Sequence, residues 1–453
     1  MSADSVIRIH LASEDMVDKG YREFHPGAVI RAGAGARMGR SLLPLAAEAS
    51  AAVLRRVSGR TPRPARAGAP ELVPDFGAAS RTPGMAGGTL VNVAPLRVLG
   101  TGGELNPASS YRFEYVTGDS HGNMTTATGG VCFSKTPWTG GPRPVIVLAP
   151  STQGVAAHCD PSHTCAIGLN VYYSPPLDAI AAYELPVFTW FLANGADVVF
   201  IDYPRDPVLG IQSYCDSISA AHSLFDALRA ARELGVAADS PVGLWGFSQG
   251  GGAVGWAAQL AEGHPDISPR AAVVGAPPSE LGEVLREVDG GLLTGVIAYA
   301  VAGLSVSRPE LHDEIMPKLT AEGLRIILRN VATCAGGTLL ASGYRDTARW
   351  TVSGHRLHDI LDDLPEVSAE FRRQRLGGIA PGMPVLLWGS RHDDVIPVAQ
   401  VRRVRDAWSL AGTDLSYHES RAPKVPGRTG VNHFGPYFRH LRTYSGWLLD
   451  QLH

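Results

Sequence analysis

One serine of this sequence has neighbours that could make it a nucleophile. Ser248 is the middle residue of a Gly-x-Ser-x-Gly pattern at 246–250, between the apolar run PVGLWGF and the helix-like run GGAVGWAAQLAE. A strand that turns sharply into a helix exposes such a serine at the helix N-terminus, where backbone amides face a developing oxyanion. The pattern recurs around Ser120, but there it lies between two strand-like segments, which is typical of a turn. The context therefore favours Ser248.

A serine hydroxyl becomes a good nucleophile when an imidazole takes its proton and a carboxylate orients that imidazole. Downstream, the apolar run MPVLLWGS is followed by RHDDVIP, which offers Asp393 and Asp394. We prefer Asp393, because D-x-x-x-P after a W-G-S turn fits the usual position of the acid, and Asp394 is the alternative. His433, in GVNHFGPY before the last helix-like segment, is the predicted base. His418 falls within a strand pattern and His392 lies directly beside the acid, so both fit this role less well.

The negative charge that develops on the attacked carbonyl oxygen needs two hydrogen-bond donors. The backbone amide of Gln249, directly after the serine, is the first candidate. The second donor should come from the loop after an early central strand, here VIVLAPSTQG, where Ser151 or Thr152 is the expected residue. The alternative interpretation of this small-residue loop is an ordinary turn.

The elements that must hold these residues follow an alternating pattern. Strand-like segments at 111–133 indicate a β-hairpin, and continuous apolar runs then alternate with helix-like segments, which predicts a mostly parallel sheet flanked by helices. About a hundred helix-like residues interrupt this rhythm before it resumes at Met383. We therefore expect an α/β-hydrolase fold in four parts: an N-terminal arm and extension (1–104), the first part of the core (105–277), a helical cap insertion (278–381) and the second part of the core (382–453).

Composition excludes several other classes of protein. A formal charge of −3 over 453 residues provides no basic field for nucleic acid. The five cysteines form no CxxC pair and do not have the spacing of a zinc site, so no metal is expected. The longest uncharged stretch, within 290–308, is glycine-rich and barely long enough to span a bilayer, which favours a buried helix.

The N-terminal region gives little support for export. Its first residues contain acids and lack an apolar run, so they do not resemble a cleavable signal peptide. Eight arginines and one acid follow between Arg31 and Arg66. A basic helix there could touch an anionic membrane surface, but a solvated arm packed on the core is the preferred interpretation.

Several stretches, taken together, resemble the secretory lipase family, which includes yeast lipase A and its actinobacterial relatives. They are YVTGDSHGNMTTATGGVCF, VIVLAPSTQGVAAHCDPS, GADVVFIDY, LWGFSQGGGAVGWAAQLA, RHDDVIP and GVNHFGPY, in family order over roughly 105–453. The resemblance implies a triad of Ser248, Asp393 and His433, a helical cap over an acyl tunnel, and no cofactor. It also implies a disulfide between the oxyanion-side loop and the cap, here Cys159 with Cys334. The family usually has a glycine at the position of Ser151, and its members are secreted.

Three functions follow from these features, in order of preference. The first is hydrolysis of a small-molecule or lipid ester through an acyl-enzyme, with transient contact to a lipid surface as a further expectation. The second is acyl transfer by the same triad to an acceptor alcohol. The third is a non-catalytic binding protein, which the filled triad positions disfavour. Chain length of the acyl group and oligomeric state do not follow from the sequence, and a cytoplasmic location stays open beside secretion.

Overall fold

A mostly parallel sheet forms the centre of the computed structural model, which describes residues 84–99, 105–106, 110–165, 168–173 and 176–453. Within these residues the sheet has nine strands in the order β1-β4-β5-β9-β6-β10-β11-β12-β13. The antiparallel end consists of β1 (Leu90–Pro95), β4 (Ser110–Gly118) and β5 (Met124–Cys132). The parallel strands are β6 (Val145–Ala149), β9 (Asp197–Pro204), β10 (Val242–Phe247), β11 (Ala271–Gly275), β12 (Val385–Ser390) and β13 (Leu415–Ser420).

The predicted strands agree closely with the observed ones. The hairpin expected at 111–133 is β4 and β5, and each continuous apolar run forms a parallel strand. Every residue of β6, β9, β10, β11 and β12 is buried, because helices cover both faces of the sheet there. The α/β-hydrolase architecture expected from the sequence is therefore confirmed.

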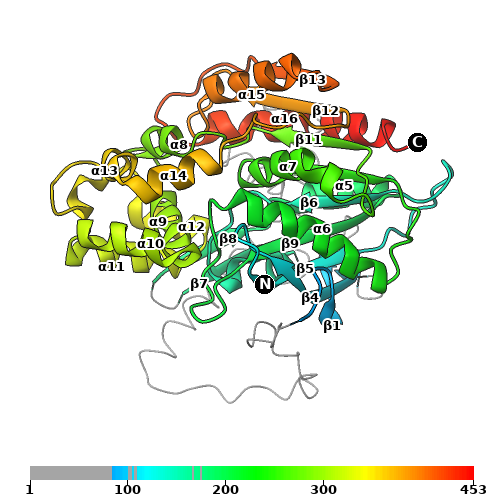
Figure 1. The fold of residues 1–453 in the computed structure, drawn as a ribbon, viewed down its shortest axis with the longest axis horizontal. Coiled ribbons are helices and arrows are strands. Elements are labelled where there is room, and N and C mark those ends of the chain that lie inside the picture. Colours follow the sequence, from blue (N-terminus) through cyan, green and yellow to red (C-terminus); the bar gives the residue numbers. More distant parts are fainter. Residues whose placement is uncertain (1–83, 100–104, 107–109, 166–167, 174–175) are drawn as a thin grey trace, which may run out of the picture.

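Helices cover the sheet in two layers (Figure 1). α6 (Ser217–Glu233), α7 (Gln249–Leu260) and α15 (Val398–Leu410) form one layer, in which the Trp408 indole donates to the Gln259 side chain at 3.1 Å. α5 (Leu185–Ala193) and α16 (Val431–Asp450) contact each other in the second layer. This arrangement places the N-termini of α7 and α16 near the carboxyl ends of the central strands.

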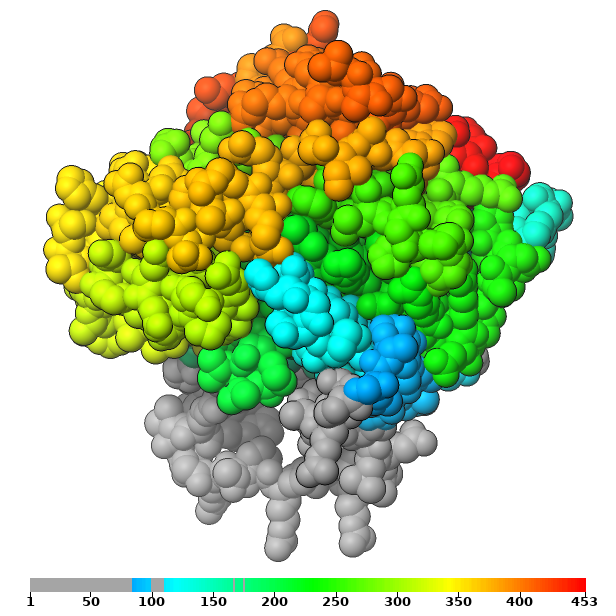
Figure 2. Space-filling view, in the orientation of Figure 1, coloured from blue at the N-terminus to red at the C-terminus, as the bar shows by residue number. Residues whose placement is uncertain are grey.

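A helical insertion separates β11 from β12. It forms a lobe beside the core in the space-filling view (Figure 2). Its helices are α8 (Leu281–Val288), α9 (Val296–Ser307), α10 (Pro309–Ile315), α11 (Ala321–Val331), α12 (Ala335–Ser342), α13 (Leu357–Asp363) and α14 (Pro365–Arg373), with short 3-10 turns η4 (Met316–Lys318) and η5 (Thr347–Trp350). The uncharged stretch within 290–308 forms the buried helix α9, as predicted. None of the described helices has both the length and the apolar character that crossing a bilayer requires.

Some boundaries differ from the expected ones. β1 belongs to the central sheet although it lies within the segment assigned to the arm; the rest of that arm, including the arginine-rich stretch, falls largely outside the described residues. Residues 178–181 form β8 (Asp178–Ala181), which pairs with β7 (Leu169–Tyr172). The remaining short elements are β2 (Val98–Leu99), β3 (Leu105–Asn106), η2 (Ala157–Cys159), α4 (Pro161–Thr164) and η3 (Ala261–Gly263).

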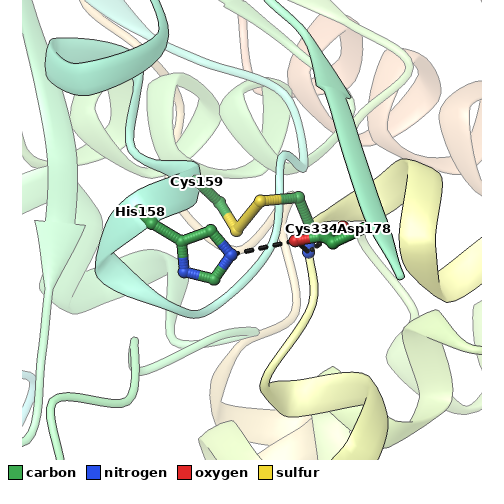
Figure 3. Close-up of side chains that lie close together, drawn as sticks. All are labelled: His158, Cys159, Asp178 and Cys334. Atoms are coloured by element: carbon green, nitrogen blue, oxygen red, sulfur yellow. Dashed lines mark hydrogen bonds and ion pairs between the residues drawn. A yellow bond between two sulfur atoms is a disulfide. The ribbon is translucent and has the colours of Figure 1, made fainter. Parts of the chain in front are cut away.

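A disulfide fastens the loop after β6 to the cap. Cys159 and Cys334 are bonded across 175 residues of sequence, which confirms the pairing that the family resemblance implied (Figure 3). Beside it the His158 imidazole contacts Asp178 at 2.9 Å, and Asp178 also accepts from the backbone amide of Cys334. A side chain at Gly154 would come within 2.8 Å of the Cys159 sulfur, so this loop can approach the cap only with glycine there. The disulfide and these contacts thus join the loop after β6 to strand β8 and to helix α12.

We predict that Cys159→Ser/Cys334→Ser lowers the free energy of unfolding by about 2–5 kcal/mol, because the bridge closes a long loop and restricts the unfolded chain. Chemical denaturation of both proteins measures this difference. Cys215→Ser, which removes a free and only partly buried thiol, is the matched control and should change stability by less than about 1 kcal/mol. Equal stability of the double variant and the wild type would contradict the prediction.

Candidate active site

Ser248 sits in a strained turn between β10 and α7. Its backbone has φ of 57° and ψ of −121°, a left-handed conformation that a serine adopts only when its surroundings enforce it. The glycines of the pattern make this possible by close approach. A side chain at Gly250 would lie 1.9 Å from the carbonyl oxygen of Ala149, and one at Gly246 would lie 2.0 Å from the carbonyl oxygen of Gly250. The other serine with this pattern, Ser120, lies in the β4–β5 turn and donates to Asp216, as expected of a turn residue.

The predicted acid and base lie together. The imidazole Nδ1 of His433 is 2.8 Å from the Asp393 carboxylate, and both side chains are only 1% exposed. Asp393 accepts two further hydrogen bonds, from the backbone amides of Val395 and Ile396. These contacts fix the carboxylate and favour the tautomer with the proton on Nδ1, which leaves Nε2 as the proton acceptor. Nε2 is buried and has no hydrogen-bond partner among the described residues.

Asp394, the alternative acid, points elsewhere. Its carboxylate accepts from the backbone amide of Gly430 at 3.0 Å and from the Asn432 side chain at 3.2 Å. Asp394 therefore holds the start of α16 rather than the imidazole. The base lies within the first turn of α16, not in a loop before it, because this helix begins at Val431 and contains Pro436.

Aromatic rings pack against the imidazole of His433. Phe247, the residue before the serine, stacks on His433 with ring centroids 4.5 Å apart and on Tyr437 at 4.3 Å. Phe434 meets the imidazole edge-on at 5.1 Å. Such packing fixes the ring plane in addition to the bond from Asp393. Ser248 and His433 line the same cavity, but no hydrogen bond joins them here; in unliganded sites this contact is often long.

The loop expected to supply the second oxyanion donor is held by a buried glutamate. The backbone amide of Ser151 donates to Glu184 at 2.7 Å and its hydroxyl donates to the same oxygen at 2.5 Å. The Ser151 amide is thus occupied and faces away from a substrate, contrary to the expectation that it could bind the oxyanion. Thr152 lines the cavity beside Ser248 and Gln249, and none of the hydrogen bonds among described residues uses its backbone amide. Gln249 is the first residue of α7, so its amide has no acceptor within the helix.

Glu184 and three tyrosines also position the loop 150–152, and the sequence did not predict them. The hydroxyls of Tyr203 and Tyr183 donate to the carbonyl oxygens of Pro150 and Thr152, and Tyr214 contacts the Thr152 hydroxyl at 2.8 Å. Burial raises the pKa of Glu184, although its hydrogen bonds from Ser151 lower it. No short motif links these residues, because they come from separate segments and meet only in the folded chain.

The candidate nucleophile and base open into an apolar cavity of about 380 Å³. The core supplies one wall through Val395, Ile396 and Phe434. The cap supplies the opposite wall with side chains from α8, α9, α12 and the segment before α9, namely Leu281, Val284, Leu285, Leu293, Val296 and Leu339. A cavity of this size with few polar groups suits an apolar ligand portion.

One group of side chains has the composition of a metal site, at the disulfide (Figure 3). His158, Cys159, Asp178 and Cys334 have ligand atoms within 4.8 Å of one another. The disulfide consumes both thiolates, so only the imidazole and the carboxylate are left, and these two bind each other. In the bridged state this group is a structural joint and lacks the donor set of a metal centre.

The comparisons with known proteins agree with this geometry. Residues 177–452, more than half of the chain, match the model of the family described as secretory lipase. The chain is 27% identical over 319 residues to a protein named probable inactive lipase from Mycobacterium tuberculosis, covering 69% of this chain and 68% of that one. It is 24% identical to a secreted triacylglycerol lipase of Malassezia globosa over 61% of this chain, and it spans 58% of that relative.

The fold is also that of a solved lipase. The crystal structure of Candida antarctica lipase A superposes with a TM-score of 0.65 at 19% identity, over 77% of this chain and 80% of that one. Identity this low supports the fold alone, whereas the family model matches the sequence across the cap and the second part of the core. The chain belongs to the secretory lipase family, a family of carboxylic ester hydrolases.

Proposed function

We propose that this protein hydrolyses carboxylic esters with an apolar acyl group, through a Ser248-His433-Asp393 triad and an acyl-enzyme intermediate. The observation that carries the proposal is the strained turn at Ser248, which shares one cavity with the Asp393-bound imidazole of His433. No cofactor is needed, because a serine, an imidazole and a carboxylate supply the nucleophile and the proton transfers themselves.

The reaction has two halves. Ser248 Oγ attacks the ester carbonyl while His433 Nε2 takes its proton, and the imidazolium then protonates the leaving alcohol. A water molecule next gives its proton to Nε2 and attacks the acyl-enzyme, which releases the acid and restores the serine. Asp393 stays ionised throughout and stabilises the imidazolium.

We assign the oxyanion donors to the backbone amides of Gln249 and Thr152. The Ser151 amide is excluded because Glu184 accepts from it. The next residue along the chain, Thr152, lines the cavity beside Ser248, which supports its amide as the second donor. Two amides fixed before the substrate binds stabilise the tetrahedral intermediate without reorganisation.

The apolar cavity is the proposed acyl site. Leucine and valine side chains of α8 and α9 face it, so a hydrocarbon chain leaving water gains about 0.8 kcal/mol for each methylene that enters. Acyl transfer to an alcohol uses the same groups, and no structural feature favours it over attack by water. The disulfide and the family's secretory character support a location in an oxidising compartment, which thiol alkylation of the native protein would test.

Esters of p-nitrophenol from acetate to palmitate test the proposal directly. We expect kcat/KM to rise about fourfold per methylene until the cavity is filled, and then to level off. Ser248→Ala should lower it by about 10⁴-fold or more. Ser120→Ala, the serine of the second Gly-x-Ser-x-Gly pattern, is the matched control and should keep most of the activity. If the folded wild-type protein cleaves none of these esters, ester hydrolysis is wrong, and acyl transfer or non-catalytic binding becomes the preferred function.

Substitutions of the two neighbouring aspartates, Asp393 and Asp394, should affect activity and stability differently. Asp393→Asn should lower kcat by about 10³–10⁴-fold with little change in stability, because the imidazole loses its orienting charge. Asp394→Asn should instead lower the free energy of unfolding by about 1–3 kcal/mol, since it weakens the bonds to Gly430 and Asn432, with a much smaller effect on kcat. Steady-state kinetics and denaturant melts measure both. A larger kcat loss in the Asp394 variant would reverse our choice of acid.

Glu184 is proposed as a positioning residue for the oxyanion loop. Glu184→Ala should lower kcat by about 10²-fold and leave KM nearly unchanged, because the loop amide serves the transition state more than the bound ester. Glu184→Gln keeps an acceptor for Ser151 and should restore part of this loss. A change confined to KM, or a loss that follows the unfolded fraction in thermal melts, would mean that Glu184 has only a structural role.

A further inference from the structure

A second, chemically different cavity lies at the edge of the sheet. This groove of about 710 Å³ is lined by residues of the edge strand β13, of α15 and of α16. Figure 1 shows where these three elements lie. The groove shares no lining residue with the apolar cavity. We call it the arginine groove, because five guanidinium groups line it: Arg391, Arg402, Arg405, Arg421 and Arg439. They come from four separate segments of the chain, so the fold gathers this charge at one place.

The groove holds too few carboxylates for its cations. Its one acid, Glu419, accepts from Arg402 at 2.8 and 2.7 Å and from Arg391 at 3.2 Å. These hydrogen bonds hold the pKa of Glu419 at about 2, so it carries a charge that is already shared between two cations. Arg405 pairs with Asp406 at 2.7 Å and lies over the Tyr417 ring.

The two remaining arginines lack such partners. In the part of the chain that the structure describes, neither Arg421 nor Arg439 forms an ion pair or a hydrogen bond through its guanidinium group. Both are exposed and face the groove from opposite elements, one after β13 and one on α16. Five arginines and one carboxylate line the groove in a chain whose net charge is −3, so the groove is a local concentration of positive charge that attracts anions.

Two histidines also line the groove and lie close to its positive charges. His418 and His440 line the groove with ring centroids 4.8 Å apart. Burial lowers the pKa of His440 most, and the positive charges of His418 and Arg439 add to this effect, so that the pKa is about 4. Neutral imidazoles can still donate or accept a hydrogen bond, so they add polar contacts without adding a counter-ion.

We propose that the arginine groove binds a phosphate-bearing ligand, with Arg421 and Arg439 as its principal contacts. A guanidinium group can form paired hydrogen bonds with two oxygens of a phosphate. A group with two or more negative charges also balances the excess positive charge of the groove better than a single carboxylate does. The volume admits more than one inorganic phosphate and falls within the range of small-molecule sites. The phosphate belongs either to a free organic phosphate or to a lipid headgroup.

The groove also adjoins elements of the proposed active site. Arg391 is two residues before Asp393, and its backbone amide donates to Ser420 at the end of β13. Arg439 lies on the same helix as His433. The binding site is inferred from the charge and shape of the groove alone, and its existence does not depend on ester hydrolysis.

Titration calorimetry with sodium pyrophosphate at low salt tests the proposal. We expect binding by the wild type that weakens as sodium chloride is added. Arg421→Ala/Arg439→Ala should raise Kd by about tenfold or more, because two charge-assisted contacts are lost. Arg403→Ala, on the same helix as Arg402 but outside the groove and paired with Glu283, is the matched control and should bind as the wild type does.

Vesicles separate the two sources of phosphate. Flotation with phosphatidylcholine vesicles, with and without phosphatidic acid, is measured on the same proteins. Binding of pyrophosphate that the double variant loses supports a free phosphate ligand, and capture only by phosphatidic acid vesicles that the double variant loses supports a headgroup. No binding of either probe, or binding that the double variant keeps, overturns the proposal. Thermal melts confirm that the variants fold, which is expected since both side chains are exposed.

Discussion

The strained turn at Ser248 is the constraint on which the rest of the site depends. A serine with φ of 57° is costly by about 1–2 kcal/mol, and the parallel strands on either side enforce it by leaving no room for another path. Gly250 packs against the end of β6 and Gly251 against the end of β11, each closer than any side chain would allow. The same turn places Gln249, the first residue of α7, at the wall of the cavity. The positions of the proposed nucleophile and of the proposed oxyanion donor therefore depend on one packing arrangement.

A buried acid beneath the neighbouring loop has the complementary role. Glu184 receives only donors: the amide and hydroxyl of Ser151 and the hydroxyl of Tyr437. These donors lower the pKa of Glu184, but burial has the larger effect and raises this pKa overall. Tyr437 also stacks on Phe247, which stacks on His433. One continuous set of contacts thus links the loop of Ser151 and Thr152 with the His433 imidazole.

Much of this fold could be predicted from the sequence, because its signals are local. Apolar runs such as 242–247 identify strands buried on both faces, and the glycine pattern after one of them identifies the turn at Ser248. Asp393 and Asp394 are harder to separate, since adjacent side chains differ only in direction, and the preferred residue proves to be the one beside His433. The pairing of Ser151 with Glu184 could not be predicted, because it joins residues 33 apart whose contact depends on the packing of α5. The bridge between Cys159 and Cys334 was implied only by family resemblance, as five cysteines allow many pairings.

Direct contacts join the cap to the loop that carries Thr152. The loop that carries Thr152 continues into Gln153, whose carbonyl accepts from the amide of Ala335, and into Gly154, which bridges to Cys334. The disulfide lies directly beside these contacts, and α12, which begins at Ala335, also lines the apolar cavity. A movement of α12 that changed the width of the proposed acyl site would therefore displace the loop that carries Thr152. Ser248, His433 and the loop residue Thr152 all line this one cavity. Under the proposed function, the access of an ester to Ser248 would therefore depend on the position of α12.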